Sequence, residues 1–302
     1  MTYSIIIPHF NIPDLLERCI KSVPMRQDTE IIVVDDKSNK ESVARLIQLQ
    51  AKYPYVQFIF SDTNGGGGKA RNIGLNAAKG KYIIFADADD FFNLCFDDVL
   101  DDYRNESADM VMFGSNSVDT NTYQTSNRAN DYVNPINFYD GKNDFNLRYN
   151  FAVPWSRFVK KQMIDNNNIR FQETPRHNDV GFGYLVGYYA KEIKVDRRAI
   201  YCITTREGSV SANRSANALK GGLEVYIAKH HFLKSKGIDL GYPWYISYAL
   251  YNLRNDKVEY QNAMRFILNH GYKRNIIYKH LFRFRFIRLM SFMKHRVLNF
   301  LH

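Results

Sequence analysis

The chain has 302 residues, of which 45% are hydrophobic and 24% charged, so it is neither a disordered nor a fibrous protein. Its formal net charge is +10, but no acidic residue follows Glu259, whereas nine basic residues do. The preceding part carries 32 basic and 31 acidic side chains. This near-neutral balance argues against a general nucleic-acid binder, whose basic residues spread over its folded surface.

Short apolar runs alternate with helical patterns through the first hundred residues. Strands are predicted at residues 3–7, 30–34, 56–60 and 82–86, helices at 14–23, 42–53 and 70–78, and a loop at 61–69. Strands this apolar, alternating with helices, are typical of a parallel sheet covered on both faces, so the predicted fold class is α/β. Ligands of such sheets bind at the carboxyl ends of the strands.

The pattern loosens after about residue 100. We predict a strand at 109–114, a long loop at 115–149, helices at 158–167 and 178–190, a strand at 193–204 and helices from 217 onward. The length and this change of pattern favour a domain of residues 1–215 followed by a helical region of residues 216–302.

Three carboxylates follow the fourth predicted strand within four residues, at Asp87, Asp89 and Asp90. A single acid at a strand end is usually a cap for the next helix. Three of them repel one another unless a cation or a set of donors compensates. Hard oxygen ligands suit Mn²⁺ or Mg²⁺, with phosphate oxygens and water completing the coordination.

A glycine run, residues 65–68, precedes Lys69 and Arg71 at the start of a predicted helix. Backbone N–H groups and two cations there form an anion site, although a flexible loop explains the glycines equally well. The run lacks the residues of a Walker A loop. It fits a nicotinamide fingerprint more closely, with Asp87 20 residues beyond Gly67. That fingerprint, however, belongs after the first strand of the unit.

Four stretches in order, residues 4–11, 31–36, 68–75 and 87–90, resemble the successive blocks of family 2 glycosyltransferases with the GT-A fold. The resemblance covers about residues 3–215. It implies a Rossmann-like, mostly parallel sheet flanked by helices, with a helical C-terminal extension. It also implies a nucleotide-diphosphate sugar donor, a divalent metal and an inverting displacement. Residues 1–100 would then bind the nucleotide sugar and residues 101–215 the acceptor.

The resemblance gives roles to the strand-end residues. The base and ribose would be held by Pro8, His9, Phe10 and Asp36, and the diphosphate would lie beside Gly68, Lys69 and Arg71. Asp87 would contact the ribose or metal-bound water, and Asp89 the metal. The metal would bridge the two phosphates and neutralise charge as the diphosphate leaves.

Inversion needs a base that takes the proton of the acceptor hydroxyl. In the family this base is the Asp of a Glu-Asp or similar pair that opens a helix, and the matching residue here is Asp179. Asn178 stands where an acid is common, and His177 is the second candidate base. The plain alternative is that Asn178 or Asp179 caps the following helix.

Two further stretches resemble family features. Residues 153–160 resemble the segment before the base, where an aromatic floor faces the acceptor, so Trp155 is either that floor or plain core. Residues 205–211 resemble an Arg-x-x-Ser loop after the last core strand. Arg206 would there reach the diphosphate, or else pair with a surface acid.

The C-terminal region, residues 273–302, has an apolar stripe and many basic residues. The stripe recurs at helical spacing and consists of Phe282, Phe286, Leu289, Met293, Val297 and Phe300. This pattern is typical of a helix lying on an anionic membrane surface. The alternative is a helix packed on the domain with a solvated basic face.

These inferences predict an inverting glycosyltransferase that uses Mn²⁺ or Mg²⁺ and, by family habit, a UDP-sugar. Its acceptor would be a glycan or lipid-linked hydroxyl in bacterial surface-polysaccharide synthesis, such as a capsule. The scattered cysteines and the lack of a signal-peptide or membrane-spanning pattern favour a cytoplasmic protein, peripheral at the inner face of the cell membrane. Two alternatives are an NAD-dependent oxidoreductase and a non-catalytic nucleotide-sugar-binding module. The oligomeric state is left open.

Overall fold

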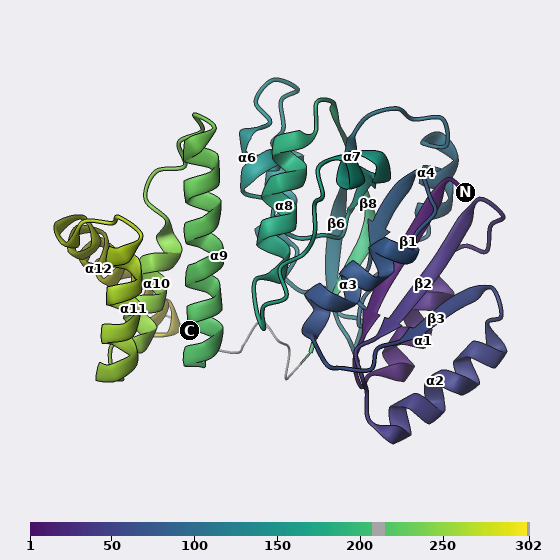
Figure 1. The fold of residues 1–302 in the computed structure, drawn as a ribbon, viewed down its shortest axis with the longest axis horizontal. Helices are drawn as coiled ribbons and strands as arrows, with labels where there is room; N and C mark the ends of the chain where they lie inside the picture. Colours follow the sequence, from purple (N-terminus) through teal and green to yellow (C-terminus); the bar gives the residue numbers. More distant parts are fainter. Residues whose placement is uncertain (207–214, 301–302) are drawn as a thin grey trace. The chain divides into compact units, whose positions relative to one another are not determined.

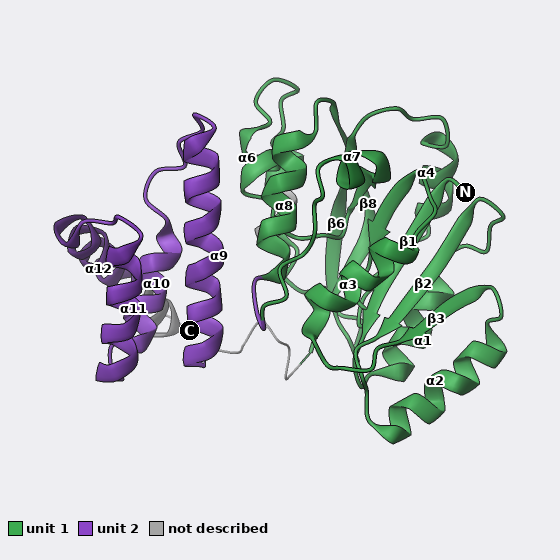
Figure 2. Cartoon of the chain, viewed as in Figure 1, with its two compact units in different colours: residues 1–174, 178–209 green, residues 175–177, 210–302 purple. Residues whose placement is uncertain are grey.

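The computed structural model describes residues 1–206 and 215–300 of the chain (Figure 1). It divides into two compact units. The first comprises residues 1–174 and 178–209, and the second comprises residues 175–177 and 210–302 (Figure 2).

The first unit is built on one eight-stranded sheet with helices packed against it (Figure 1). The strands are β1 (Tyr3–His9), β2 (Thr29–Asp35), β3 (Val56–Phe60), β4 (Tyr82–Phe85), β5 (Phe91–Phe92), β6 (Met110–Asp119), β7 (Arg157–Lys160) and β8 (Ile193–Thr205). Their order is β3-β2-β1-β4-β7-β6-β8-β5. Neighbours among β1 to β4 are parallel, as are β6 and β8, whereas β7 and β5 run antiparallel to their partners. The mostly parallel α/β sheet is therefore confirmed.

The helices of this unit alternate with the strands in its first half. They are α1 (Pro13–Ser22), α2 (Lys40–Lys52), α3 (Gly66–Ala77), α4 (Phe96–Asp102), α5 (Asn130–Asn137), α6 (Phe145–Tyr149), α7 (Lys161–Asn166) and α8 (Asn178–Tyr189). Because β1, β2 and β4 are buried almost throughout, the chain between them must cover both faces of the sheet.

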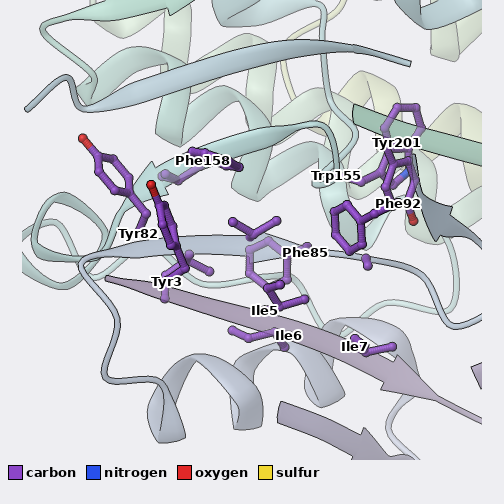
Figure 3. Packing of buried hydrophobic residues seen from close by; sticks show 14 of the residues in the cluster. Tyr3, Ile5, Ile6, Ile7, Tyr82, Phe85, Phe92, Trp155, Phe158 and Tyr201 are labelled. Carbon is purple, nitrogen blue, oxygen red and sulfur yellow. The ribbon is translucent and has the colours of Figure 1, made fainter. Parts of the chain in front are cut away.

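Tyrosines close the amino-terminal end of the core, where β1 and β4 begin (Figure 3). The hydroxyl of Tyr3 donates to the carbonyl of Leu100 at 2.7 Å, and that of Tyr82 donates to the carbonyl of Ala108 at 2.7 Å. Phe158 packs against both rings, with centroid separations of 5.4 and 6.3 Å. Each of these two buried hydroxyls thus has a hydrogen-bond partner. The candidate functional side chains lie at the opposite, carboxyl ends of the strands.

Three predicted elements were wrong. Residues 158–167 are not one helix, because Arg157–Lys160 forms β7, which fills the sheet between β4 and β6 before α7 begins. The stretch 115–149 is not one loop, because β6 continues to Asp119 and α5 and α6 follow. The last four residues of the predicted loop 61–69 belong to α3, which begins at Gly66. Non-local pairing, which local periodicity does not reveal, decides β7 and the extension of β6 to Asp119.

The second unit contains four helices within its described residues. They are α9 (Ala216–Ser235), α10 (Trp244–Leu253), α11 (Lys257–Asn269) and α12 (Arg274–Phe300). Its own apolar core includes Leu223, Ile246, Leu250 and Ile277. Within the described residues, no helix combines the length and apolar character needed to cross a bilayer.

Candidate active site

The carboxyl ends of β1 and β2 are joined by a buried pair, His9 and Asp35. His9 Nδ1 lies 2.8 Å from Asp35 Oδ1, and its Nε2 accepts from the backbone N–H of Ile12 at 3.1 Å. Nδ1 therefore carries the proton that bonds to the carboxylate. Burial alone raises the pKa of Asp35, but hydrogen bonds from His9 and Ser38 outweigh it and lower the pKa. Both ring nitrogens of His9 are thus engaged within the protein.

Asp36 holds the first turn of α3. Its Oδ1 accepts from the N–H of Gly65 at 2.8 Å and its Oδ2 from the N–H of Gly66 at 2.7 Å. A carboxylate at a helix N-terminus satisfies free donors and opposes the positive end of the helix dipole. This explains why a glycine run begins a helix, and it means that the protein's own acid occupies part of the expected anion site.

The remaining residues of these two segments are more open. Phe10 is 48% exposed, and Pro8 is partly exposed, at the end of β1. Lys69 is partly exposed, and its Nζ donates to Thr63 Oγ1. The Phe10 ring is therefore available to a stacked base and the Lys69 ammonium to an anion.

Arg71, on α3, links the acidic loop after β4 to the start of α8. Its Nη2 donates to Asp87 Oδ1 at 2.6 Å, and its Nη1 donates to Asn178 Oδ1 at 3.0 Å. The guanidinium also lies 5.4 Å from the centroid of the Phe171 ring. A buried arginine with two defined acceptors is rigid, so it fixes the spacing between Asp87 and α8.

The loop after β4 is anchored by Asp90, which is 3% exposed. Its Oδ2 accepts from the hydroxyl of Tyr201 at 2.9 Å, and its Oδ1 from the N–H of Thr204 at 2.7 Å. The same hydroxyl accepts from the N–H of Asp87 at 2.8 Å. Burial and the charges of Asp87 and Asp89 raise the pKa of Asp90 well above its ordinary value. Asp90 therefore shapes the loop, and its two acidic neighbours are left at the surface.

Asp89 faces Arg206 across this loop. Asp89 Oδ2 accepts from Arg206 Nε at 2.8 Å, and both side chains are about a quarter exposed. The backbone carbonyl of Asp89 accepts from Thr204 Oγ1 at 2.6 Å and from Arg18, on α1. The rest of the Arg-x-x-Ser stretch, from residue 207, lies outside the described residues.

The carboxylates of Asp87 and Asp89 fit a hard divalent cation in part. Among the residues that the structure describes, Asp87 Oδ2 and Asp89 Oδ1 accept no hydrogen bond, so each has an oxygen free for a ligand. The described part of the chain holds no group of three or more His, Cys, Asp or Glu side chains arranged for a metal. Two protein oxygens suit Mg²⁺ or Mn²⁺ when the phosphates of a ligand supply the rest.

Asp179 follows Asn178 in the first turn of α8 and is partly exposed. Burial raises the pKa of its carboxyl above the ordinary aspartate value, while Arg71 opposes the shift and Asp87 adds to it. An aspartate with a raised pKa is a stronger base than an ordinary one once it is ionised.

Trp155 and His177 each have partners that bear on their predicted roles. Trp155 is 4% exposed and its ring stacks on that of Tyr201 with centroids 5.3 Å apart, so of the two environments considered for it the structure shows the core. His177 belongs to the second unit, where its Nε2 lies 3.2 Å from the Tyr245 hydroxyl. Burial, with help from Arg176, lowers the pKa of His177 to about 4, so its imidazole is neutral near pH 7.

Sequence analysis missed three residues that contact the Asp87–Asp90 loop. Arg18, Tyr201 and Thr204 shape the Asp87–Asp90 loop from positions far away in the chain. Each is separated from its partner by more than 70 residues in the sequence, and no spacing pattern predicts such a contact.

The close approach of α3 to the segment before α8 predicts a stability effect at Gly68. A methyl group there would overlap the Gln172 backbone carbonyl, whereas at Gly67 it would lie 3.2 Å from the end of Arg71 and 3.9 Å from the Asn178 amide nitrogen. We expect Gly68→Ala to lower the free energy of unfolding by about 1–3 kcal/mol more than Gly67→Ala. Urea denaturation measures this difference, and equal stabilities would contradict the packing described.

Comparison with known proteins places this geometry in a family. The model of glycosyl transferase family 2 matches residues 4–167, more than half of the chain. One relative is a poly(ribitol-phosphate) beta-glucosyltransferase of Bacillus spizizenii, 43% identical over 96 residues. That match covers 30% of this chain and 15% of the relative, so the chain spans a small part of that protein's length.

Solved structures show the same fold. A crystal structure of S. aureus TarS 1–349 with UDP-GlcNAc superimposes with a TM-score of 0.68 at 20% identity, covering 90% of this chain and 82% of that one. The mannosyltransferase PcManGT from Pyrobaculum calidifontis, in complex with GDP-Man and Mn²⁺, gives a TM-score of 0.54 at 14% identity, covering 95% and 80%. The fold is therefore GT-A, and the chain belongs to glycosyl transferase family 2.

Proposed function

We propose that the first unit transfers a sugar, with inversion, from a nucleotide diphosphate to an acceptor hydroxyl. One observation carries the proposal: Arg71 joins the Asp87–Asp90 loop to the helix that begins with Asn178 and Asp179. Arg71 would thereby hold the carboxylates proposed to bind the donor at a fixed distance from the helix that carries the candidate base. Family membership supports a nucleotide-sugar donor. The UDP-GlcNAc complex of TarS supports UDP as the nucleotide in this proposal.

In this proposal the acceptor oxygen forms a bond to the anomeric carbon while the bond from that carbon to the phosphate oxygen breaks. The nucleoside diphosphate leaves with the electron pair, and Asp179 accepts the proton of the acceptor hydroxyl. Phe10 would stack on the base, and Lys69, Arg71 and Arg206 would stabilise the diphosphate. Cations that are in place before the bond breaks lower the barrier, because they need no reorganisation during the reaction itself.

The structure modifies two roles proposed from sequence. His9 and Asp36 already bond to the protein through their polar atoms, so they would shape the base and ribose site, with Asp36 offering only its remaining lone pairs. Gly68 would place α3 close to the segment before α8, as its contact with Gln172 indicates.

We propose Asp87 and Asp89 as the residues that hold Mn²⁺ or Mg²⁺ together with the donor phosphates. When bound, the metal supplies Lewis-acid stabilisation of the leaving diphosphate. Arg206 now bonds to Asp89, so the guanidinium would turn toward the diphosphate when the donor binds. The Mn²⁺ complex of PcManGT supports a metal in this fold, and the free oxygens of Asp87 and Asp89 support its place here.

The acceptor is proposed to be a glycan or lipid-linked hydroxyl in surface-polysaccharide synthesis, as the similarity to a poly(ribitol-phosphate) beta-glucosyltransferase suggests. We further propose that residues 273–302 associate with the inner, anionic face of the cell membrane. Phe282 and Phe286 on α12 are 73% and 55% exposed, which supports an unpartnered apolar stripe. The side chains of Leu289, Met293, Val297 and Phe300 lie outside the described residues.

A donor screen tests the proposal. The unfolding temperature is measured with UDP-sugars, GDP-sugars and NAD, each with and without Mn²⁺. We expect a UDP-sugar with Mn²⁺ to raise it, because a ligand that binds only the native state stabilises by mass action. A rise with NAD alone, and none with any nucleotide sugar, would contradict the proposed donor class.

A further inference from the structure

The second unit contains a cavity of about 800 Å³ between α11 and α12, with Arg254, the residue after α10, at its edge. Five basic side chains line it: Arg254, Lys257, Arg265, Arg274 and Arg285. The other lining residues are neutral, and two of them, Tyr260 and Tyr278, offer hydroxyl donors. The cavity lies wholly within one unit, so its shape depends only on how these helices pack.

The charge of this cavity is uncompensated within the described part of the chain. None of the five basic side chains has a carboxylate within 4.0 Å there, although many surface cations of the first unit do. All five are exposed, so like charges that repel one another are gathered without a counter-ion from the protein. Such an arrangement raises the local concentration of anions and favours a ligand of high charge density.

An apolar stripe lies next to the cavity on α12. Phe282, Phe286 and Met290 are 73%, 55% and 51% exposed and follow one another at intervals of four residues. On the same helix, Tyr278 and Arg285 line the cavity. Residues four apart are neighbours on a helix surface, so Phe282 lies next to Tyr278, and Phe286 and Met290 follow with a turn of about 40° at each step. An anion site is thus joined to an exposed apolar surface.

We propose that the cavity binds the phosphate headgroup of an anionic membrane lipid. The guanidinium and ammonium groups would hold the phosphate oxygens, and the acyl chains would lie along Phe282, Phe286 and Met290. The basic cavity and the apolar stripe together favour a lipid over a soluble phosphate, because a soluble anion has no apolar part to bury against the stripe. This proposal rests on the proposed membrane association. It adds one defined lipid-binding site to the general attraction between basic residues and an anionic surface.

The test is flotation of the full chain with vesicles of phosphatidylcholine, alone or mixed with phosphatidylglycerol or oleate at matched surface charge. Lys257→Gln/Arg265→Gln removes two cavity cations. Lys279→Gln/Arg283→Gln is the matched control, because it removes two exposed cations of α12 that do not line the cavity. We expect the cavity variant to lose about tenfold more affinity for phosphatidylglycerol vesicles than the control.

Every other outcome counts against the site. Equal losses in the two variants, or equal binding to oleate and phosphatidylglycerol vesicles, would show diffuse attraction and overturn the proposal. Stabilisation by inorganic diphosphate that the cavity variant loses, without vesicle binding, would identify a soluble-phosphate site instead. Donor binding, measured by thermal shift in the same samples, should be unchanged in both variants, so failure of the lipid site is distinguishable from failure of the transferase proposal.

Discussion

Asp179→Asn is expected to lower the transfer rate by about 10²–10⁴-fold and to leave the affinity for the nucleotide sugar unchanged. The substitution keeps the size of the side chain and removes only its ability to accept a proton. Asn178, and not Asp179, makes the bond to Arg71, so the link to the donor carboxylates survives. Steady-state release of the nucleotide, together with donor titration, separates the two effects.

Asp165→Asn is a matched control, because this acid lies on α7 in a surface pair with Lys161. It should retain full activity. Unchanged turnover in Asp179→Asn would remove Asp179 from the role of base, whereas a parallel loss of donor affinity would assign it to binding.

The raised pKa of Asp179 also predicts how the transfer rate of the parent chain, and the stability of Asp179→Asn relative to it, depend on pH. Transfer needs the ionised carboxylate, so the acid limb of the rate profile should lie above the range of an ordinary aspartate. Ionisation is easier in the unfolded chain, so this group lowers stability as pH rises from its ordinary to its raised pKa. Asp179→Asn should therefore unfold at a higher temperature than the parent at neutral pH, with the difference lost in acid.

Asp89→Ala is expected to abolish the Mn²⁺-dependent part of donor binding, a loss of at least about tenfold in affinity. The reason is that Asp89 Oδ1 is one of two oxygens free for the metal, and Asp87 alone leaves the ion held mainly by the donor. The measurement is donor titration with and without Mn²⁺.

Arg206→Gln provides the control, because it breaks the 2.8 Å pair with Asp89 and keeps the carboxylate. It should weaken binding of the diphosphate at all metal concentrations and still respond to Mn²⁺. If Asp89→Ala responds to Mn²⁺ as strongly as the parent chain, the carboxylate is not a metal ligand and serves only to hold Arg206.

The half of the sheet formed by β1 to β4 could be predicted from sequence, because these strands are local apolar runs. Residues 56–60 form β3 with the predicted bounds, and β1, β2 and β4 lie within three residues of theirs. β7 escaped because only its antiparallel pairing with β4 and β6 makes it a strand. The bounds of α3 escaped because Asp36, a residue 30 positions away from Gly66, stabilises its first turn.

The candidate site shows the same division. Asp36, Asp87 and Asp89 were found because acids follow apolar strands, and the direction of a parallel sheet gathers strand ends. What each acid binds was not predictable: Asp36 bonds to glycine N–H groups, Asp87 to Arg71 and Asp89 to Arg206. The sequence does not show whether Trp155 lies in the core or at the surface of a binding site, because an aromatic ring is common in both environments.

The most direct test is proton NMR of the sugar first released or transferred from the α-linked donor that the thermal screen selects. A single inverting displacement with Asp179 as base predicts the β anomer, formed by the parent chain and not by Asp179→Asn. The α anomer as first product, or release in the Asp179→Asn variant at the parent rate, would contradict this mechanism.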